Sequence, residues 1–169
     1  MAQNVEIKVR IPDLAAAGAM VRGLGATSQG IVEQVDRYYE VDVHRRVKLR
    51  TVAGRAAELI TYTRPEIDGV RVSTYQVTPV RDGACLVPKG RPKVLVRKRR
   101  EVLLLDNVRV HLDDVDHLGT FLELEAVVDE AHDEAACRRQ VDAITAALGV
   151  RHDQLLRESY ADLLAARPR

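Results

Sequence analysis

Alternation of polar and β-branched residues opens the chain and constrains its fold more than any other feature. Residues 4–11 read NVEIKVRI. Successive side chains of an extended strand point to opposite faces, so Asn4, Glu6 and Lys8 share one face. The same period of two returns along the chain, and it predicts about eight antiparallel strands. Besides the first, these segments are VDRYYEV (35–41), RRVKLRTV (45–52), AELITYTRP (57–65), RVSTYQVTP (71–79), KVLVRKRREVLLL (93–105), NVRVHLDDV (107–115) and GTFLELEAVV (119–128).

Three segments have the apolar spacing of helices instead. Asp13 is placed to cap an alanine-rich helix that ends near Leu24. Residues 133–148 and 153–164 repeat apolar positions at helical spacing, with Gly149 as a stop between them. We expect all three helices to pack on the aliphatic faces of the strands.

Two connections between the predicted strands contain residues typical of turns and loops. Asp106 and Asn107 are typical of a hairpin turn between two of the strands. Residues 81–92, RDGACLVPKGRP, contain two prolines and two glycines, which predicts a loop and makes this segment a candidate lid.

Each strand has one charged face and one aliphatic face, and the charges differ from strand to strand. A solvated charged face is the common explanation for any single strand, but random solvation would mix the two signs. Because the helices need apolar surface to cover, we expect the charged faces to point inward. The predicted fold is therefore α+β: an eight-stranded antiparallel β-barrel or tunnel with a charged interior and helices packed outside. The inward basic residues would be Lys48, Arg50, Arg64, Lys98 and Arg100, and the inward acidic residues Glu6, Asp113, Glu123 and Glu125.

Burial of so many ions is unfavourable unless each is paired, so we expect a ligand to complete the tunnel. Arginine binds phosphate oxygens in a two-pronged manner, and lysine supplies a compact charge. Carboxylates bind hard divalent cations such as Mg²⁺. A triphosphate carried with Mg²⁺ or Mn²⁺ meets both requirements.

Composition excludes other classes of protein. The 26 basic and 25 acidic residues nearly cancel, which gives no indication of nucleic-acid binding. Cys85 and Cys137 are isolated, so neither a zinc site nor a disulfide framework is indicated. No apolar run is long enough to span a bilayer, and no signal peptide opens the chain. We expect one domain, residues 1–169, in the cytoplasm and without a membrane partner.

In combination, several motifs resemble those of the CYTH family, the triphosphate tunnel metalloenzymes, and in particular its class IV adenylate cyclase-like branch. A short ExE or KxR pattern is weak evidence alone, but the order of the motifs over nearly the whole chain is specific. The matching segments are NVEIKV, QVDRYYE, VKLR, ITYTRP, VRKRR, HLDDVDHLGTFLELEAVV and ESYADLL.

The resemblance implies a role for each matching residue. It implies cleavage of ATP to cyclic AMP and pyrophosphate, with hydrolysis of an inorganic, thiamine or nucleoside triphosphate, or a reaction on another phosphorylated metabolite, as the alternatives. It also suggests a homodimer. The implied catalytic residues are Lys8 and Glu6; the triphosphate ligands are Lys48, Arg50, Arg64, Lys98 and Arg100; the metal ligands are Glu6, Asp113, Glu123 and Glu125.

One residue departs from the family pattern. Asn4 occupies the position of the first glutamate of the family's ExExK motif. An amide oxygen can coordinate Mg²⁺ but offsets none of its charge. We therefore expect weaker metal binding, the loss of one metal, a changed substrate, or a protein that binds a phosphorylated ligand without turnover. Four residues on inward faces stay without a chemical role: Arg71, Ser73, Tyr75 and His111.

Overall fold

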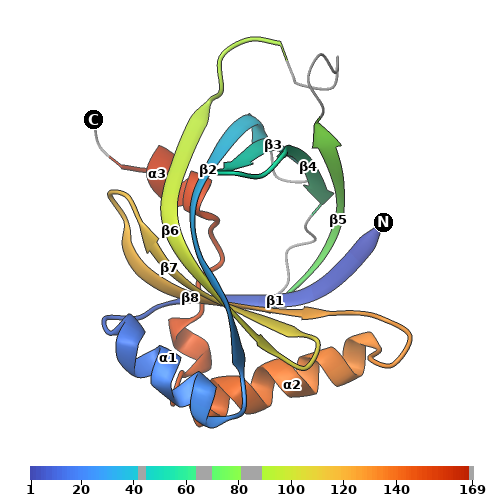
Figure 1. The fold of residues 1–169 in the computed structure, drawn as a ribbon, viewed down its shortest axis with the longest axis vertical. Coiled ribbons are helices and arrows are strands. Elements are labelled where there is room, and N and C mark those ends of the chain that lie inside the picture. The colour runs from blue at the N-terminus through green and yellow to red at the C-terminus, as the bar shows by residue number, and fades with distance from the viewer. Residues whose placement is uncertain (42–44, 64–69, 81–88, 168–169) are drawn as a thin grey trace.

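The computed structural model describes residues 1–41, 45–63, 70–80 and 89–167, and in this part of the chain the strands close into one antiparallel barrel. Around the barrel the order is β1-β5-β4-β3-β2-β6-β7-β8 (Figure 1). The predicted α+β fold is confirmed. The strands are β1 (Ala2–Arg10), β2 (Thr27–Val41), β3 (Arg45–Val52), β4 (Ala57–Thr63), β5 (Arg71–Val80), β6 (Val94–Leu105), β7 (Val108–Val115) and β8 (Gly119–Val127).

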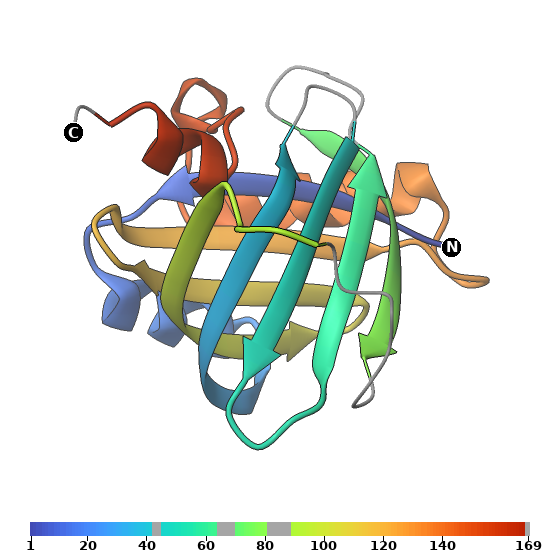
Figure 2. The same cartoon turned by 90° about the horizontal axis from the view of Figure 1, so that it is seen from above.

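Two helices cover one side of the barrel. They are α1 (Leu14–Gly23) and α2 (Glu134–Ala147), which lie beneath β1, β7 and β8 in Figure 1. The side chains of Asp13 and Asp133 cap them by accepting hydrogen bonds from backbone N–H groups of the first turn. On the other side, no helix of the described residues covers β2, β3 and β4 (Figure 2).

The main core lies between these helices and the sheet. Val5, Ile7 and Val9 of β1 are fully or almost fully buried there, together with Val21 of α1 and Val141 of α2. Full burial of one such side chain contributes about 1.5–3 kcal/mol. The aliphatic face of β1 therefore points to the helices, which leaves Asn4, Glu6 and Lys8 on the inside, as the alternation predicts.

A second buried cluster lies where the last helix meets the barrel. The short helix α3 (Tyr160–Ala165) packs there against β6. Tyr160 meets Phe121 of β8 edge to face, with the ring centroids 4.9 Å apart. Tyr38 and Val96 belong to the same buried cluster.

The predicted helix over residues 153–164 is confirmed only from Tyr160 onward. The chain instead forms a 3₁₀ turn at His152–Gln154, continues in extended form, and begins α3 at Tyr160. Leu155 forms a β-bridge with Val9, and the N–H of Leu156 donates to the carbonyl of Lys8. Because these backbone groups are used by the edge of the barrel, the helix cannot run through them.

Of the other predictions, one turn is confirmed, and one loop and one site residue are not tested by the structure. The hairpin turn at Asp106 and Asn107 is confirmed, since β6 ends at Leu105 and β7 begins at Val108. Arg64 and residues 81–88 of the candidate lid lie outside the described residues, so nothing in the structure tests them. No helix in the described ranges is both long and apolar enough to cross a membrane.

Candidate active site

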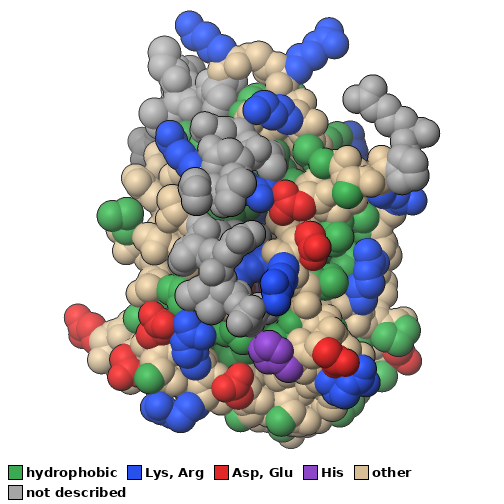
Figure 3. Space-filling model, turned by 180° about the vertical axis from the view of Figure 1, so that it is seen from behind, with side chains coloured by type: hydrophobic (Ala, Val, Ile, Leu, Met, Phe, Trp, Pro, Cys, Tyr) green, Lys and Arg blue, Asp and Glu red, His purple; other side chains and the backbone are tan. Residues whose placement is uncertain are grey.

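A polar tunnel runs through the barrel. One cavity of about 250 Å³ is lined by inward side chains of β1, β3, β6 and β8, and a second of about 280 Å³ continues past Arg50, Arg100, Arg109 and Glu125, which line both. A water molecule occupies about 30 Å³, so either cavity has room for a ligand larger than a few waters. Basic and acidic side chains lie beside one another in the middle of the face seen in Figure 3.

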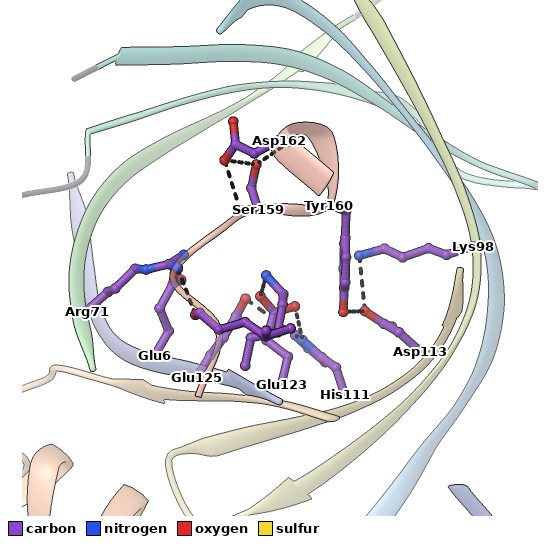
Figure 4. Close-up of polar contacts among 12 residues, drawn as sticks. Glu6, Arg71, Lys98, His111, Asp113, Glu123, Glu125, Ser159, Tyr160 and Asp162 are labelled. Carbon is purple, nitrogen blue, oxygen red and sulfur yellow. Dashed lines mark hydrogen bonds and ion pairs between the residues drawn. The ribbon is translucent and has the colours of Figure 1, made fainter. Parts of the chain in front are cut away.

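Strand register arranges the acidic wall in rows. Glu6 of β1 lies opposite Glu125 of β8 and opposite Arg71 of β5, while Lys8 lies opposite Glu123 in the next row. His111 of β7 is the other cross-strand partner of Glu123. Directly opposed residues on one face have Cβ atoms about 4.5–5.5 Å apart, so these rows bring the side chains together, as Figure 4 shows.

On β2 and β3, Asp36 holds two of the predicted phosphate ligands. Its carboxylate is 2.9 Å from Lys48 Nζ and 2.9 Å from Arg50 Nε, and it is almost fully buried. Burial opposes ionisation, but Arg50 and Lys48 outweigh it and hold the pKa of Asp36 well below its usual range. Both cations are therefore fixed in place before any ligand arrives.

On β6 and β7, Asp113 plays the same part for Lys98 and Arg100. Arg100 donates to both of its oxygens at 2.6 Å, Lys98 Nζ is 3.3 Å away, and the hydroxyl of Tyr160 donates to Oδ2 at 2.8 Å. Burial, and next to it the charge of Arg100, lower the pKa of Lys98 to about 8. Asp113 is fully buried and does not line either cavity, so this arrangement gives no support to its predicted role as a metal ligand.

The predicted metal ligands Glu123 and Glu125 are also ion-paired. Glu123 is 3.2 Å from Lys8 Nζ and 2.7 Å from the Arg100 guanidinium. Burial raises the pKa of Glu123, but Lys8 and the other cations outweigh it and hold the pKa well below the usual value. Glu125 is ion-paired with Arg109 at 2.9 Å. Burial likewise raises the pKa of Glu125, but His111 and Arg109 outweigh it and lower the pKa, and a low pKa favours the ionised form of both carboxylates.

His111, Glu123 and Glu125 form a group that could hold a metal ion, with their ligand atoms all within 4.8 Å of one another. Nδ1 of His111 lies 3.7 Å from Glu123 and 3.8 Å from Glu125. Burial, followed by the charge of Arg100, lowers the pKa of His111, which favours the neutral imidazole. Glu6 lines the first cavity with Glu123 and Glu125, whereas His111 lines the second, and only Glu125 of these four lines both. The carboxylate of Glu6 is 4.0 Å from Arg71.

Asn4 and Ser73 complete this wall at one end. They are cross-strand partners on β1 and β5, and each is only 3% exposed. Within the described part of the chain, Asn4 Oδ1 and Ser73 Oγ have no hydrogen-bond partner. Buried polar atoms without partners are uncommon, so water, an ion or a ligand would be needed to satisfy these two oxygens.

The predicted and observed walls differ in one respect. We predicted that basic and acidic strands would be separate, but Asp36 and Asp113 lie among the cations and pair with them. Charges in the wall therefore compensate one another to a large extent. Sequence reasoning also missed Asp36 and Arg109 and gave Arg71 no chemical role, although the alternation in VDRYYEV places Asp36 on the same face as Tyr38.

Comparison with known proteins identifies the family. The family model of the CYTH domain matches residues 2–160, and the chain belongs to the CYTH family. The chain is 25% identical over 178 aligned residues to a Methanocaldococcus jannaschii protein named "Putative adenylate cyclase", with 95% of this chain and 97% of that protein covered.

Solved structures share the fold at low sequence identity. A protein from Pyrococcus horikoshii is 22% identical, with a TM-score of 0.81 and coverage of 95% of this chain and 98% of its own. A protein from Vibrio parahaemolyticus, described as a "putative adenylate cyclase", is 18% identical, with a TM-score of 0.73 and coverage of 98% and 100%. At these identities the likeness establishes a common fold.

Proposed function

We propose that this chain is a divalent-metal-dependent enzyme that acts on a triphosphate, and that its reaction converts ATP to cyclic AMP and pyrophosphate. The observation that carries the proposal is the arrangement of charge across the tunnel. Lys48 and Arg50 lie on β3, and the barrel order places β3 opposite β8, which carries Glu123 and Glu125. Such a tunnel offers cations to phosphate oxygens on one wall and carboxylates to a metal on the other.

The basic wall supports triphosphate binding. Lys48, Arg50, Lys98 and Arg100 all line the first cavity, and each is held by Asp36 or Asp113. Because these carboxylates fix the cations, phosphate binding costs little side-chain entropy. In this proposal Asp113 positions Lys98 and Arg100 and is not a metal ligand.

The acidic wall fits a divalent cation of the kind on which the CYTH family depends. Glu123, Glu125 and Glu6 would hold it, and the unpartnered amide oxygen of Asn4 lies in the same wall. A cation bound there would lower the pKa of the attacking oxygen and offset charge on the leaving group. Since Arg100 and Arg109 already contact these carboxylates, we expect the cation to enter with its phosphate ligand.

The tunnel residues would guide one displacement at phosphorus. The ribose 3′ oxygen bonds to the α-phosphorus, the bond from that phosphorus to the bridging oxygen breaks, pyrophosphate leaves, and the hydroxyl proton is released. Lys8 is held between Glu123, at 3.2 Å, and the Tyr160 ring, at 4.3 Å from its centroid. This position allows Lys8 to stabilise negative charge on the phosphate. In this proposal Glu6 orients the metal.

The test is incubation of the purified protein with ATP and Mn²⁺ or Mg²⁺, followed by mass spectrometry of the products. Glu123→Gln removes a charge from the acidic wall, and we expect at least a hundredfold loss of cyclic AMP formation, the range for loss of one transition-state-stabilising group. Glu101→Gln is the matched control, because Glu101 pairs with Arg22 on the outside of the barrel. Absence of both cyclic AMP and pyrophosphate from the wild-type reaction would reject the cyclase.

One observation favours a second function. Asn4 is buried, neutral and without a hydrogen-bond partner for its amide oxygen among the described residues, where the family motif has a carboxylate. A site with fewer charged ligands binds its metal more weakly, so less of the protein carries the metal that the reaction requires. The alternatives are therefore hydrolysis of another triphosphate, or binding of a phosphorylated ligand without turnover. Inorganic phosphate as the product would identify hydrolysis, and tight binding with unchanged ligand would identify a binding protein.

A further inference from the structure

His111 is the one histidine among the described residues that lines the tunnel. It is the cross-strand partner of Glu123, so β7 and β8 fix the imidazole and the carboxylate on the same face. Arg109, two residues earlier, lies opposite Glu125 in the same way. The imidazole thus lies against both carboxylates of the acidic wall (Figure 4).

The geometry of Nδ1 does not fit a simple wall residue. His111 is 5% exposed, and its Nδ1 has no hydrogen-bond partner within the described chain. The nearest carboxylate oxygens lie 3.7 Å and 3.8 Å away, beyond hydrogen-bonding distance. A buried ring nitrogen usually has a partner, and the separations of 3.7 Å and 3.8 Å leave space for a water molecule or an ion between Nδ1 and the two carboxylates.

The spacing is that of ligands around one ion. Two donor atoms that each lie about 2.1 Å from a metal are separated by roughly 3 Å at a right angle and about 4.2 Å across it. Both measured separations fall within this interval. One oxygen of Glu125 is directed to Arg109 and the other to His111, so a donor stays available on the side of the imidazole.

We propose that His111 is a protein ligand of the divalent cation, together with Glu123 and Glu125, and that it makes the site prefer a first-row transition-metal ion such as Mn²⁺ to Mg²⁺. This inference rests on the proposed metal-dependent function. Mg²⁺ takes oxygen ligands and keeps most of its waters, whereas first-row transition metals accept imidazole nitrogen readily. One nitrogen donor in an otherwise carboxylate site therefore shifts the choice of metal.

The test uses the metal itself as the probe, with tripolyphosphate as the anion because it contains no nitrogen. Electron spin echo spectroscopy of bound Mn²⁺ detects coupling to the ¹⁴N nuclei of a coordinated imidazole. We expect this coupling in the wild-type protein and its loss in His111→Asn. Calorimetric titrations of Mn²⁺ and of Mg²⁺ should show the ratio of their affinities falling by about tenfold or more in His111→Asn, the scale expected for loss of a supporting metal contact.

His132→Gln is the matched control, because His132 pairs with Asp106 and Asp129 outside the tunnel. This variant should keep both the coupling and the affinity ratio. Binding of Mn²⁺ to the wild type without ¹⁴N coupling would overturn the inference and leave the proposed function intact. If neither metal binds the wild type with tripolyphosphate, the metal-dependent function fails and the inference with it. The wild-type spectrum decides between these outcomes even if His111→Asn does not fold.

Discussion

Tyr160 and Asp113 are joined by a 2.8 Å hydrogen bond from the tyrosine hydroxyl to Oδ2, although 47 residues separate them. Tyr160 is the first residue of α3, and Asp113 is the buried anion that holds Lys98 and Arg100. The ammonium groups of Lys8 and Lys98 lie 4.3 Å and 4.8 Å from the centroid of the Tyr160 ring. The C-terminal helix therefore contributes directly to the position of the tunnel's cations.

Removal of this hydroxyl should destabilise the protein without removing the ring. Tyr160→Phe deletes one hydrogen bond to a buried carboxylate, which is worth about 1.5–3 kcal/mol. We expect the free energy of unfolding to fall by that amount in urea denaturation, with an unchanged dependence on urea concentration. Tyr39→Phe, at a half-buried position on β2, should change stability far less. An equal fall in the free energy of unfolding in both variants would show that the hydrogen bond to Asp113 does not stabilise the fold.

Loss of the negative charge at Asp36 should lower the free energy of unfolding more than loss of the Tyr160 hydroxyl does. Asp36→Asn leaves Lys48 and Arg50 buried without their counter-ion, and breaking a buried ion pair in this way costs about 3–5 kcal/mol. Denaturation at pH 7 measures this loss. A tripolyphosphate anion can replace the missing charge, so saturating tripolyphosphate should restore part of the stability in Asp36→Asn. No restoration would indicate that the anion does not reach these two cations.

Stability should also fall steeply in acid. The folded protein holds the pKa values of Asp36, Asp113 and Glu123 below their ordinary values, because their cationic neighbours outweigh burial. Groups of this kind stabilise the fold fully above the unfolded pKa, near 4, and their contribution is lost as the pH falls through the folded pKa. We expect stability to decline below about pH 5, with a shallower decline in Asp36→Asn at the same ionic strength. If stability falls equally steeply with pH in the wild type and in Asp36→Asn, the ion pairs of Asp36 do not cause the acid sensitivity.

Binding of a phosphate anion should weaken at mildly alkaline pH, because Lys98 loses its proton there. The pKa of Lys98 is about 8, since burial and Arg100 disfavour its charge, and a bound phosphate favours the charged form. Binding above pH 8 therefore requires uptake of a proton, and affinity falls by up to about tenfold per pH unit. Calorimetry with tripolyphosphate at pH 7 and pH 9 should show a larger loss in the wild type than in Lys98→Arg, whose charge is permanent. The same loss in both proteins would exclude Lys98 as the source.

A carboxylate in place of the Asn4 amide should strengthen metal binding. Asn4 and Glu6 line the same wall of the tunnel, and Asn4→Glu adds a hard charged ligand to it. We expect the affinity for Mn²⁺, measured by calorimetry with tripolyphosphate, to rise about tenfold. Gln3→Glu adds the same charge to the other face of β1 and should have no such effect. An affinity unchanged by Asn4→Glu would place this residue outside the metal site.

Alternation in the sequence predicted eight strands and the faces of β1, but β2 begins at Thr27, eight residues before the predicted segment. The pattern in β1 placed Val5, Ile7 and Val9 on one side and Glu6 and Lys8 on the other. In the structure the first three belong to the hydrophobic core and the other two line the tunnel. This succeeds because side-chain direction in a strand depends only on the backbone, which repeats every two residues. The capped helix after Asp13 and the hairpin at Asp106 were predictable for the same reason, since caps and turns are local.

Contacts between distant segments were decided by the tertiary structure alone. Closure of the barrel places β1 between β5 and β8, and only then do Arg71 and Glu125 become neighbours of Glu6. The pairing of Leu155 and Leu156 with β1 ended a helix that local spacing favoured. Likewise, Asp36 acquired its role from Lys48 and Arg50 on the adjacent strand. Local periodicity specifies which way a side chain points, whereas strand order and register specify what it meets, and ion pairing depends on the latter.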